Sequence, residues 1–361
     1  MRPLRRVSPG PEVLPALRAA LAGGDALFVG AATDLPAMVE QRVALVVETS
    51  GSSGRPKRVA LAADALLANA GASESALGGP GQWVLALPTH YIAGLNVLTR
   101  SLAAGTEPVV VAGEHFTVAG FLDAVARLES PDRYTSLVPA QLAFLLDDPA
   151  ATAALTGFRG VLVGGQALAA PVRERAEAAG IPVVRSYGSS ETSGGCVYDG
   201  VPIGRTAVRV VDGEVHLGGP TIAEGYLGDP ELSADRFLEE GGMRWFRTAD
   251  GGSWDGTRLA ITGRRDDVII SGGVKVSLGA VERLLHEHGF ADAVVVKGVD
   301  ARWGEVPVAF VTSDADPGPA TAAIEAALGA AARPRFRRGS GVPLLPSGKP
   351  DRVSLEQKAS E

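Results

Sequence analysis

The chain of 361 residues contains a single cysteine, Cys196, so it can form neither an internal disulfide nor a zinc site built from several thiolates. It also contains no apolar run approaching about 18 residues, the length that a membrane-spanning helix needs. Its first residues include early arginines but no uninterrupted apolar segment of signal-peptide length. These absences predict a cytoplasmic protein that is not inserted into a membrane.

Positive charge is also in deficit, with 34 Lys and Arg against 41 Asp and Glu and a formal net charge of -7. Nucleic acids and anionic membranes bind clustered cations, so neither is expected as the main partner. The one tight basic run, at residues 333–338, is more typical of a solvated face than of an anion site. The hydrophobic content of 46% predicts packed cores, and the length predicts two or three domains.

The stretch from residue 43 to residue 188 alternates short apolar runs with Ala- and Leu-rich segments of helical period. This pattern predicts a parallel sheet covered by helices, and hence the α/β class. We predict strands at residues 43–48, 83–87, 108–112, 134–138, 160–163 and 182–186. Helices are predicted at residues 140–146 and 169–179, the second opened by Pro171 and ended by Gly180.

The pattern changes twice in the second half of the chain. Residues 209–217 place an Asp-Gly pair between alternating residues, which predicts a β-hairpin and a β-rich subdomain. After residue 263, helical and strand patterns alternate again and predict a small α+β domain. Its helices are expected at residues 276–288 and 320–332, and its strands at residues 293–299 and 306–312.

A loop rich in glycine and hydroxyl residues, residues 48–57, directly follows the first predicted strand. Glycines let the backbone approach a phosphate closely, hydroxyls donate to its oxygens, and Lys57 adds a positive charge. The loop is not a Walker A motif, because Pro56 precedes the lysine and Arg58 follows it. Taken alone, such a loop is more often a flexible connection, so its assignment as a polyphosphate site depends on further motifs.

A second loop of glycines and hydroxyl residues, residues 187–195, ends another predicted strand. Ligands of open α/β sheets bind beyond the carboxyl ends of strands. Glu191 in this loop is a candidate magnesium ligand, because Mg²⁺ takes one or two carboxylates together with phosphate oxygens. Without the other motifs, an ordinary exposed loop glutamate would be the better interpretation.

Three further segments complete an ordered set: residues 245–250, 263–273 and 346–352. Together with the two loops they resemble, in order and spacing, the core motifs of the adenylate-forming superfamily of acyl-CoA synthetases, peptide-synthetase adenylation domains and luciferases. The resemblance extends from residue 43 to residue 352. It implies an enzyme that uses ATP to activate a carboxylic acid as its acyl-adenylate and then passes the acyl group to coenzyme A.

The resemblance assigns the ATP site residue by residue. Glu191 is the Mg²⁺ ligand, Asp250 accepts hydrogen bonds from both ribose hydroxyls, and Arg264 assists at the ribose or the phosphates. Lys349 is the catalytic lysine that reaches the acyl carboxylate and the α-phosphate. The other residues assigned to ATP are Thr49, Ser50, Gly51, Ser52, Ser53, Gly54, Lys57, Gly164, Gly165, Tyr187, Gly188 and Ser190.

The resemblance also implies how the chain is divided. A large domain, residues 1–263, combines mixed and parallel sheets with a β-rich subdomain, and a small mobile α+β domain, residues 268–361, carries Lys349. Residues 264–267 form the hinge, with Asp266 at the family's hinge position. The small domain is expected to dock for adenylation and to swing away for thioester formation. The residues expected to line the CoA channel are Gly272 and Gly273.

The acid site is implied by residues around another predicted strand end. His90 resembles the family histidine at the border of the acyl pocket, and we favour a gating or orienting role because a carboxylate is already ionised near neutral pH. Residues 187–200 and the short total length resemble the short actinobacterial form of the o-succinylbenzoate-CoA ligases of menaquinone biosynthesis, which implies an aromatic dicarboxylate. The residues assigned to the acid are His90, Asn96, Gly194 and Gly195. Candidates for its second carboxylate are Arg185, Arg205 and Asn96.

The chain departs from the family at its front, where only about 48 residues precede the phosphate loop. Part of the usual acyl-pocket wall is therefore missing, and a homodimer that supplies this wall stays open. Arg58 and Ser190 replace the family's usual glycine and threonine but keep the needed chemistry. Three alternatives also stay open: another aryl- or acyl-CoA ligase, an adenylating enzyme that serves a carrier protein, and a non-catalytic nucleotide-binding protein.

Overall fold

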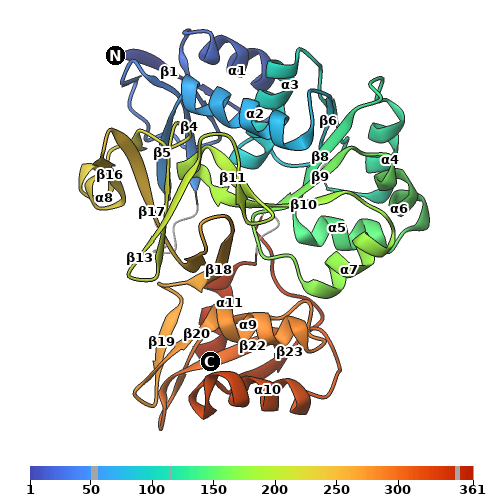
Figure 1. Ribbon diagram of the computed structural model, residues 1–361, viewed down its shortest axis with the longest axis vertical. Helices are drawn as coiled ribbons and strands as arrows, with labels where there is room; N and C mark the ends of the chain where they lie inside the picture. The colour runs from blue at the N-terminus through green and yellow to red at the C-terminus, as the bar shows by residue number, and fades with distance from the viewer. Residues whose placement is uncertain (50–55, 114, 346–349, 361) are drawn as a thin grey trace.

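The fold is taken from a computed structural model, in which residues 1–49, 56–113, 115–345 and 350–360 are described. The described residues form four β-sheets with helices packed on them (Figure 1). Three sheets make up the larger part of the molecule, and the fourth belongs to a smaller part that carries the C-terminus. None of the described helices is long and apolar enough to span a membrane. The predicted α/β class is confirmed.

The first sheet contains the N-terminal strands in the order β15-β5-β4-β2-β1-β3. Within it β1, β2 and β4 are parallel, whereas β5 returns antiparallel to β4. Its elements are β1 (Arg2–Val7), α1 (Val13–Leu21), β2 (Ala26–Val29), β3 (Met38–Val39), β4 (Val43–Thr49), β5 (Lys57–Ala62) and β15 (Gly225–Tyr226).

The strand predicted at residues 43–48 exists as β4, but its assignment to one parallel sheet with the later strands is wrong. It pairs with β2 and β5 in this separate sheet. A continuous apolar run indicates burial on both faces but carries no information about which strands lie beside it. The unpredicted strand β5 also places Lys57 at the start of a strand.

The second sheet contains the remaining predicted strands of the α/β region, in the order β12-β11-β10-β9-β8-β6-β7. Its central strands are parallel, and β11 and β12 are antiparallel. Its strands are β6 (Gln82–Leu85), β7 (Val109–Val110), β8 (Arg133–Leu137), β9 (Gly160–Gly164), β10 (Val183–Ser189), β11 (Gly194–Tyr198) and β12 (Val201–Pro202). The helices around it are α2 (Ala63–Leu77), α3 (Ile92–Ala104), α4 (Val118–Ala126), α5 (Pro139–Leu146), α6 (Pro149–Thr156), α7 (Ala170–Ala178) and the 3₁₀ turn η1 (Ser190–Thr192).

The third sheet is the predicted β-rich region, and it begins with the predicted hairpin. Its two turn residues, Asp212 and Gly213, have φ angles of +49° and +77°, which an Asp-Gly pair adopts in a tight hairpin turn. The hairpin prediction is therefore confirmed. The elements are β13 (Ala207–Val211), β14 (Glu214–Gly218), α8 (Pro230–Arg236), β16 (Phe237–Glu240), β17 (Met243–Trp254) and β18 (Leu259–Arg264).

The fourth sheet forms the smaller part of the molecule, and its predicted helices and strands are found within a few residues of their expected bounds. The helix predicted at residues 320–332 is divided at Gly329, whose φ is +85°. The elements are β19 (Val268–Ser271), β20 (Val274–Ser277), α9 (Leu278–Glu287), β21 (Val294–Asp300), β22 (Gly304–Val311), α10 (Gly318–Leu328), η2 (Ala330–Ala332), β23 (Arg335–Arg338) and α11 (Arg352–Ser360).

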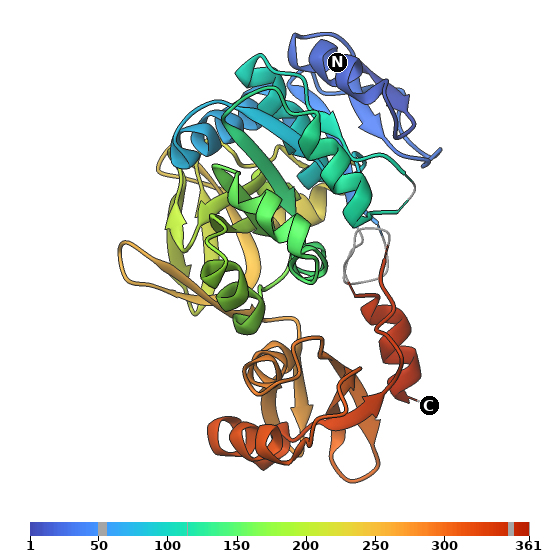
Figure 2. The same ribbon diagram turned by 90° about the vertical axis from the view of Figure 1, so that its right-hand side faces the viewer.

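The hydrophobic cores separate the two parts. Buried apolar clusters of the larger part lie between residues 7 and 259, and those of the smaller part between residues 269 and 359. No cluster of the described side chains combines the two. Residues 265–267 link β18 to β19 at the junction, and Figure 2 shows the two parts one above the other. Across this junction, Arg283 of α9 donates to the carbonyl of Thr262 at 3.1 Å.

Candidate functional site

Asp250 lies in the long strand β17, and only 16% of its side chain is exposed. Its Oδ2 accepts a hydrogen bond of 2.6 Å from the hydroxyl of Tyr187, near the end of β10. Its Oδ1 lies 3.5 Å from Nη1 of Arg264, the last residue of β18. The fold thus brings together three residues, from three strands, that were each assigned to the nucleotide.

The charge of Asp250 is balanced by its neighbours. Burial raises the pKa of Asp250, while the hydrogen bond from Tyr187 and the charge of Arg264 act against that rise. The guanidinium of Arg264 also donates to both carboxylate oxygens of Asp266, at 2.8 and 2.6 Å. A buried carboxylate that only accepts hydrogen bonds, held by two donors, suits a ligand that presents hydroxyl groups, such as a ribose.

Acidification is expected to weaken nucleotide binding at a higher pH than an ordinary aspartate would cause, because Asp250 must be ionised to accept two hydrogen bonds and its pKa lies above the usual 3.8. Tyr187→Phe removes a donor that lowers this pKa, so the loss should begin at still higher pH. AMP affinity measured by calorimetry across the acid range checks both points. An acid limb at the same pH in the two proteins would contradict the coupling of Tyr187 to Asp250.

The same raised pKa has a consequence for stability. Between the usual value of 3.8 and the raised value, the folded chain holds a proton on Asp250 that the unfolded chain has released. The contribution of Asp250 to the free energy of unfolding therefore falls as pH rises through this window. A bound ribose would stabilise the ionised carboxylate, because its hydroxyls would donate hydrogen bonds to it.

Glu191 belongs to the turn η1, which directly follows β10. Its Oε1 accepts a hydrogen bond of 2.9 Å from the hydroxyl of Tyr226, and Nζ of Lys57 lies 5.6 Å from the centre of the Tyr226 ring. Burial raises the pKa of Tyr226, so this hydroxyl keeps its proton and stays a donor. The tyrosine, which the sequence analysis missed, links the lysine of the phosphate loop to the proposed magnesium ligand.

A magnesium ion would have one protein carboxylate at this place. Within the described ranges, no group of three or more His, Cys, Asp or Glu side chains could hold a metal by itself. A single carboxylate, oriented by the Tyr226 hydroxyl, fits the preference of Mg²⁺ for one or two carboxylates completed by phosphate oxygens and water. The residues present therefore fit a magnesium ion that arrives with a nucleotide.

Three of the glycines assigned to ATP lie where the ends of β9, β10 and β11 approach closely. A Cβ on Gly188 would lie 2.2 Å from the carbonyl oxygen of Gly194, and a Cβ on Gly164 would lie 2.8 Å from that of Ser186. Gly165 follows with a φ of +82°. Larger residues at these positions would separate the strands, so the glycines keep the carboxyl ends of β9 and β10 close together.

The residues assigned to the acid include a closely packed contact between α3 and β11. Asn96 is 3% exposed and its amide donates to the carbonyl of Ser193 at 2.8 Å. A Cβ on Gly194 would lie 1.9 Å from that amide nitrogen, and a Cβ on Gly195 would lie 1.9 Å from Oγ of Ser186. Ser190 is also buried. Asn96 therefore supports the strand beside the site, and its amide nitrogen already donates to the Ser193 carbonyl.

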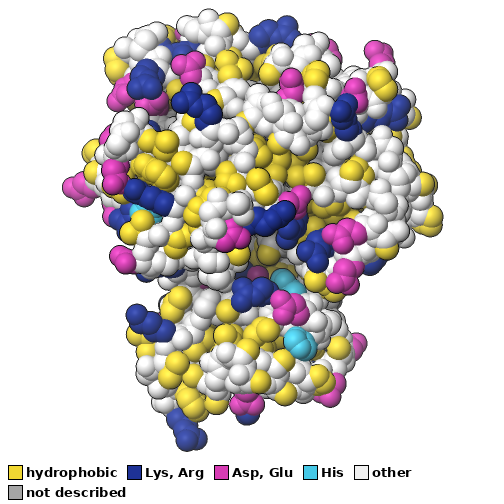
Figure 3. All heavy atoms as spheres, in the orientation of Figure 1, with side chains coloured by type: hydrophobic (Ala, Val, Ile, Leu, Met, Phe, Trp, Pro, Cys, Tyr) yellow, Lys and Arg dark blue, Asp and Glu magenta, His cyan; other side chains and the backbone are white. Residues whose placement is uncertain are grey.

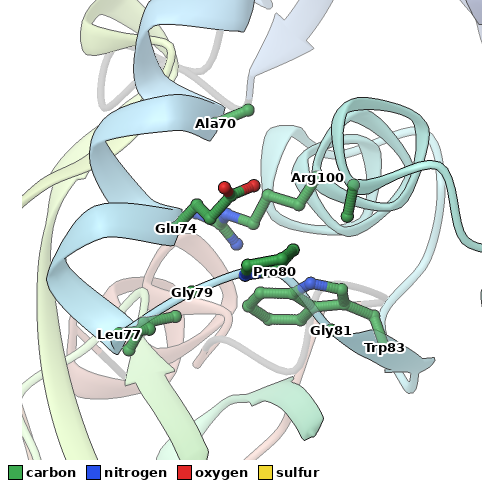
Figure 4. Close-up of a pocket in the computed structure, with 9 residues that line it drawn as sticks. Ala70, Glu74, Leu77, Gly79, Pro80, Gly81, Trp83 and Arg100 are labelled. Atoms are coloured by element: carbon green, nitrogen blue, oxygen red, sulfur yellow. The ribbon is translucent and has the colours of Figure 1, made fainter. Parts of the chain in front are cut away.

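A group of buried polar contacts at the C-terminal end of β11 was not predicted. The hydroxyl of Tyr198 lies 2.8 Å from Oγ of Ser73 on α2 and accepts from Arg100 on α3 at 3.3 Å. The Arg100 guanidinium lies 5.0 Å from the centre of the Trp83 ring, and Figure 4 shows it beside that ring with Glu74 pointing toward it. Polar residues spaced four apart in apolar helices, Asn96 and Arg100, were the available signal.

His90 follows β6 and lies at the same edge of the second sheet as the ends of β9 and β10. Its ring lies against Tyr91, with ring centres 4.1 Å apart. Burial lowers the pKa of His90, so its imidazole is neutral near neutral pH. Its buried Nδ1 has no hydrogen-bond partner among the described residues. A neutral, half-buried ring at this edge suits the orienting role that was expected of it.

The second-carboxylate candidate Arg185 is exposed on β10, and its Nε donates to Oδ1 of Asp199 at 2.8 Å. Thr49 ends β4, where its Oγ1 donates to the carbonyl of Lys57 at 3.4 Å. The assigned residues that lie outside the described ranges are Ser50, Gly51, Ser52, Ser53, Gly54 and Lys349.

The smaller part carries the remaining assigned residues. Gly272 and Gly273 form the turn between β19 and β20, with φ angles of +55° and +83°. A Cβ on Gly272 would lie 2.4 Å from the Trp303 ring, whereas nothing lies within 4 Å of one on Gly273. Gly273 is therefore the open side of this turn. Figure 3 shows acidic, basic and histidine side chains gathered where the two parts of the molecule meet.

The chain on either side of residues 346–349 is tied to the smaller part. Leu344 and Pro350 form an antiparallel bridge, and the amide of Asp351 donates to the carbonyl of Pro343 at 2.9 Å. Arg352, at the start of α11, donates to both carboxylate oxygens of Glu282 on α9, at 3.0 and 2.8 Å. The ends of the segment that includes Lys349 are thereby anchored.

Comparison with known proteins places this arrangement among nucleotide-using enzymes. The family model described as "AMP-binding enzyme" matches residues 11–227. The chain is 44% identical to a probable 2-succinylbenzoate–CoA ligase of Mycobacterium tuberculosis, over 96% of this chain and 94% of that protein. It is 30% identical to the 2-succinylbenzoate–CoA ligase of Enterococcus faecalis, over 76% of this chain and 60% of that longer protein.

Solved structures agree with the fold. The o-succinylbenzoate CoA synthetase (MenE) of Bacillus subtilis, in complex with its acyl-adenylate intermediate, matches with a TM-score of 0.73 and 25% identity, over 95% of this chain and 80% of that one. The amide bond synthetase McbA of Marinactinospora thermotolerans matches with a TM-score of 0.77 and 26% identity, over 98% of this chain and 79% of that one. The Bacillus subtilis enzyme has also been solved with ATP and a magnesium ion.

Proposed function

The chain belongs to the AMP-binding enzyme family, and from this premise we propose that it is an ATP-dependent acid–CoA ligase whose acid is o-succinylbenzoate, acting in menaquinone biosynthesis. The observation that carries the proposal is the 44% identity to a probable 2-succinylbenzoate–CoA ligase over nearly the full length of both chains. The buried Asp250, held by Tyr187 and Arg264, supports the nucleotide half of the reaction. ATP, Mg²⁺ and coenzyme A are the corresponding cofactor and co-substrates.

The reaction has two steps. An oxygen of the acid's carboxylate attacks the α-phosphorus of ATP, and the bond to pyrophosphate breaks, which leaves the acyl-adenylate. The thiol of coenzyme A then gives up its proton to water, its sulfur attacks the acyl carbonyl carbon, and the acyl C–O bond to AMP breaks, so that AMP departs with the electrons of that bond. In water the reacting groups repel each other or meet rarely. Holding them in place is therefore the main task of the protein.

The residues of the chain divide this task. Asp250 would accept hydrogen bonds from the ribose hydroxyls, either in addition to the hydrogen bond from Tyr187 or replacing it. The charge of Arg264 would keep Asp250 ionised. Glu191, oriented by Tyr226, would hold Mg²⁺, which neutralises phosphate charge when bound. The neutral ring of His90 would orient the acid at the edge of the second sheet.

We propose that residues 264–267 act as the hinge between a large domain, residues 1–263, and a small domain, residues 268–361. The separate hydrophobic cores on either side support this division. The small domain would bring Lys349 to the adenylation site and then turn so that Gly272 and Gly273 approach the pantetheine channel. The open face of Gly273 is consistent with close contact to a ligand.

Asp266→Pro is expected to reduce thioester formation from preformed acyl-adenylate by about tenfold or more while changing adenylation only a few-fold, because proline restricts backbone rotation at the hinge. Asp266→Ala is the matched control, since it also removes the partner of Arg264 but leaves φ free. Single-turnover rates of the two steps separate these effects. Equal loss in both steps, or equal loss in both variants, would contradict the hinge.

Two further features are proposed with this function. We place the enzyme in the cytoplasm, where its single cysteine, buried and with its pKa raised to about 12, stays a thiol. We also propose a homodimer that completes the acyl pocket beside the short N-terminal region. Light scattering of the purified chain at working concentration tests the second point.

The function is tested with a panel of acids in the presence of ATP, Mg²⁺ and coenzyme A. Pyrophosphate release reports adenylation, and mass spectrometry of the thioester reports transfer. We expect turnover with o-succinylbenzoate and little with benzoate, which lacks the second carboxylate. Preference for another acid would favour a different aryl- or acyl-CoA ligase, adenylation without thioester would favour delivery to a carrier protein, and no turnover with any acid would favour a nucleotide-binding protein.

A further inference from the structure

Glu214, the first residue of β14, is a buried carboxylate that the sequence analysis did not single out. It is 8% exposed and lies in the third sheet opposite Gly251 of β17. Its Oε2 accepts from Arg247 at 3.1 and 3.3 Å, and its Oε1 lies 4.0 Å from a guanidinium nitrogen of Arg236. Burial raises the pKa of Glu214, but the hydrogen bonds and charge of Arg247 outweigh it and leave the pKa below the usual value. The group is therefore ionised.

The same carboxylate also holds a strained piece of backbone. Its Oε1 accepts a hydrogen bond of 3.2 Å from the amide of Ala249. Ala249 has a φ of +60°, a left-handed conformation that alanine, unlike glycine, adopts only at an energetic cost. On the C-terminal side of the same residue, the Ala249 carbonyl accepts a hydrogen bond from the amide of Arg265 at 2.8 Å. Ala249 is thus fixed through both its amide and its carbonyl.

The strained residue immediately precedes Asp250. The hydroxyl of Thr248 donates to the carbonyl of Val215 at 2.8 Å and accepts from the amide of Asp250 at 3.0 Å, so both neighbours of Ala249 are also held. The pairing of β14 with β17 shifts register between Glu214 and His216, and such irregularities re-aim side chains. The irregular backbone at residues 248–250 of β17 therefore decides where the Asp250 carboxylate points.

We propose that Glu214 is a positioning residue for nucleotide binding: it holds Ala249 in the left-handed conformation and so aims the Asp250 carboxylate at the ribose. This inference rests on the proposed function only in taking the ligand to be an adenine nucleotide. Glu214 acts through the backbone of Ala249 and through no contact with the ligand. Its removal lets the backbone at Ala249 relax, and the Asp250 carboxylate then leaves the place where Tyr187 and Arg264 hold it.

The inference makes a specific prediction for AMP affinity, measured by calorimetry. Glu214→Ala is expected to raise the Kd for AMP by about 10- to 50-fold, within the range that loss of a charged hydrogen bond produces. Glu214→Gln keeps an oxygen acceptor for the Ala249 amide, so a smaller loss of a few-fold is expected. Adding Ala249→Gly to either variant should restore most of the affinity, because glycine adopts the same φ without strain.

The controls separate positioning from stability. Glu240→Gln removes an exposed carboxylate that pairs with Arg209 in the same sheet, and it should leave the Kd unchanged. Ala249→Gly does not restore the carboxylate partner that Arg247 has lost. The melting temperature of the double variant should therefore stay low while its affinity for AMP recovers. In steady state, the KM for ATP should rise more than kcat falls.

Several outcomes would overturn the inference. They are an unchanged Kd in Glu214→Ala, or affinity that recovers only together with the melting temperature, or no recovery on adding Ala249→Gly. Should Glu214→Ala not fold, the same cycle is run with Glu214→Gln. Failure of the unaltered chain to bind AMP would instead overturn the proposed function, which is a distinguishable result.

Discussion

Asp250→Ala is expected to lower kcat/KM for ATP by about 10²- to 10⁴-fold, because the two charge-assisted hydrogen bonds proposed to the ribose would be lost and each contributes about 1.5–3 kcal/mol. The structure gives a further reason for a large effect. The variant leaves the hydroxyl of Tyr187 and the guanidinium of Arg264 without their shared buried acceptor. Arg264 keeps its hydrogen bonds to Asp266, but the buried Tyr187 hydroxyl loses the acceptor that held it, which weakens the site beyond the loss of the direct contact.

The measurement is pyrophosphate exchange at varied ATP, with AMP affinity by calorimetry as a direct check. Asp123→Ala is the matched control, since Asp123 is an exposed aspartate of α4 that pairs with Arg127 on its own helix. We expect the control to behave as the unaltered chain. A similar kcat/KM in Asp250→Ala and in the control would remove Asp250 from the nucleotide site.

Lys349→Ala is expected to lower the rate of adenylate formation by about 10²- to 10³-fold, the loss typical of removing one group that stabilises charge in a transition state. In the adenylation step a carboxylate oxygen approaches an α-phosphate of the same sign, so a cation between them acts mainly on the transition state. Lys349 itself lies outside the described residues. The prediction rests on the family motif and on the anchored residues on either side.

The second half-reaction distinguishes this role from a general loss of folding. Thioester formation from preformed acyl-adenylate and coenzyme A should change only a few-fold, because charge no longer has to be brought to the α-phosphate. Lys358→Ala, an exposed lysine of α11 in the same part of the molecule, is the control and should leave both steps intact. Unchanged pyrophosphate release in Lys349→Ala would remove the proposed role.

Local patterns predicted much of the fold because local physics decides it. The Asp212-Gly213 turn needs two residues with positive φ, and an Asp-Gly pair supplies them in any context. The helix α7 begins beside Pro171 and ends before Gly180, as each residue favours on its own. Apolar runs located the strands of the second sheet for the same reason.

Local patterns did not predict which strands pair with each other. β4 is as apolar as the strands of the second sheet, yet it pairs with β2 and β5 in another sheet. Residues 1–42 carry two parallel strands, a third short strand and a helix that no motif indicated. Pairing depends on which apolar faces are free when the chain collapses, and periodicity describes only one element at a time.

For the site, the sequence by itself determined which residue types were available and in what order. Glycine, hydroxyl and acidic residues at strand ends indicated a candidate phosphate and magnesium site, and the resemblance of the five ordered motifs to the adenylate-forming superfamily implied a nucleotide and a carboxylic acid; the comparisons agree with that family. These conclusions needed no geometry, because they depend on residue types and on the order of motifs along one chain.

Only the tertiary structure decided how those residues act on one another. Tyr187 and Asp250 lie 63 positions apart, and Glu214 and Ala249 lie 35 positions apart, yet each pair is hydrogen-bonded. Burial then raised the pKa of Asp250 and lowered that of His90. A hydrogen bond needs two atoms within about 3 Å, and desolvation needs a completed core, so both exist only after distant strands have packed.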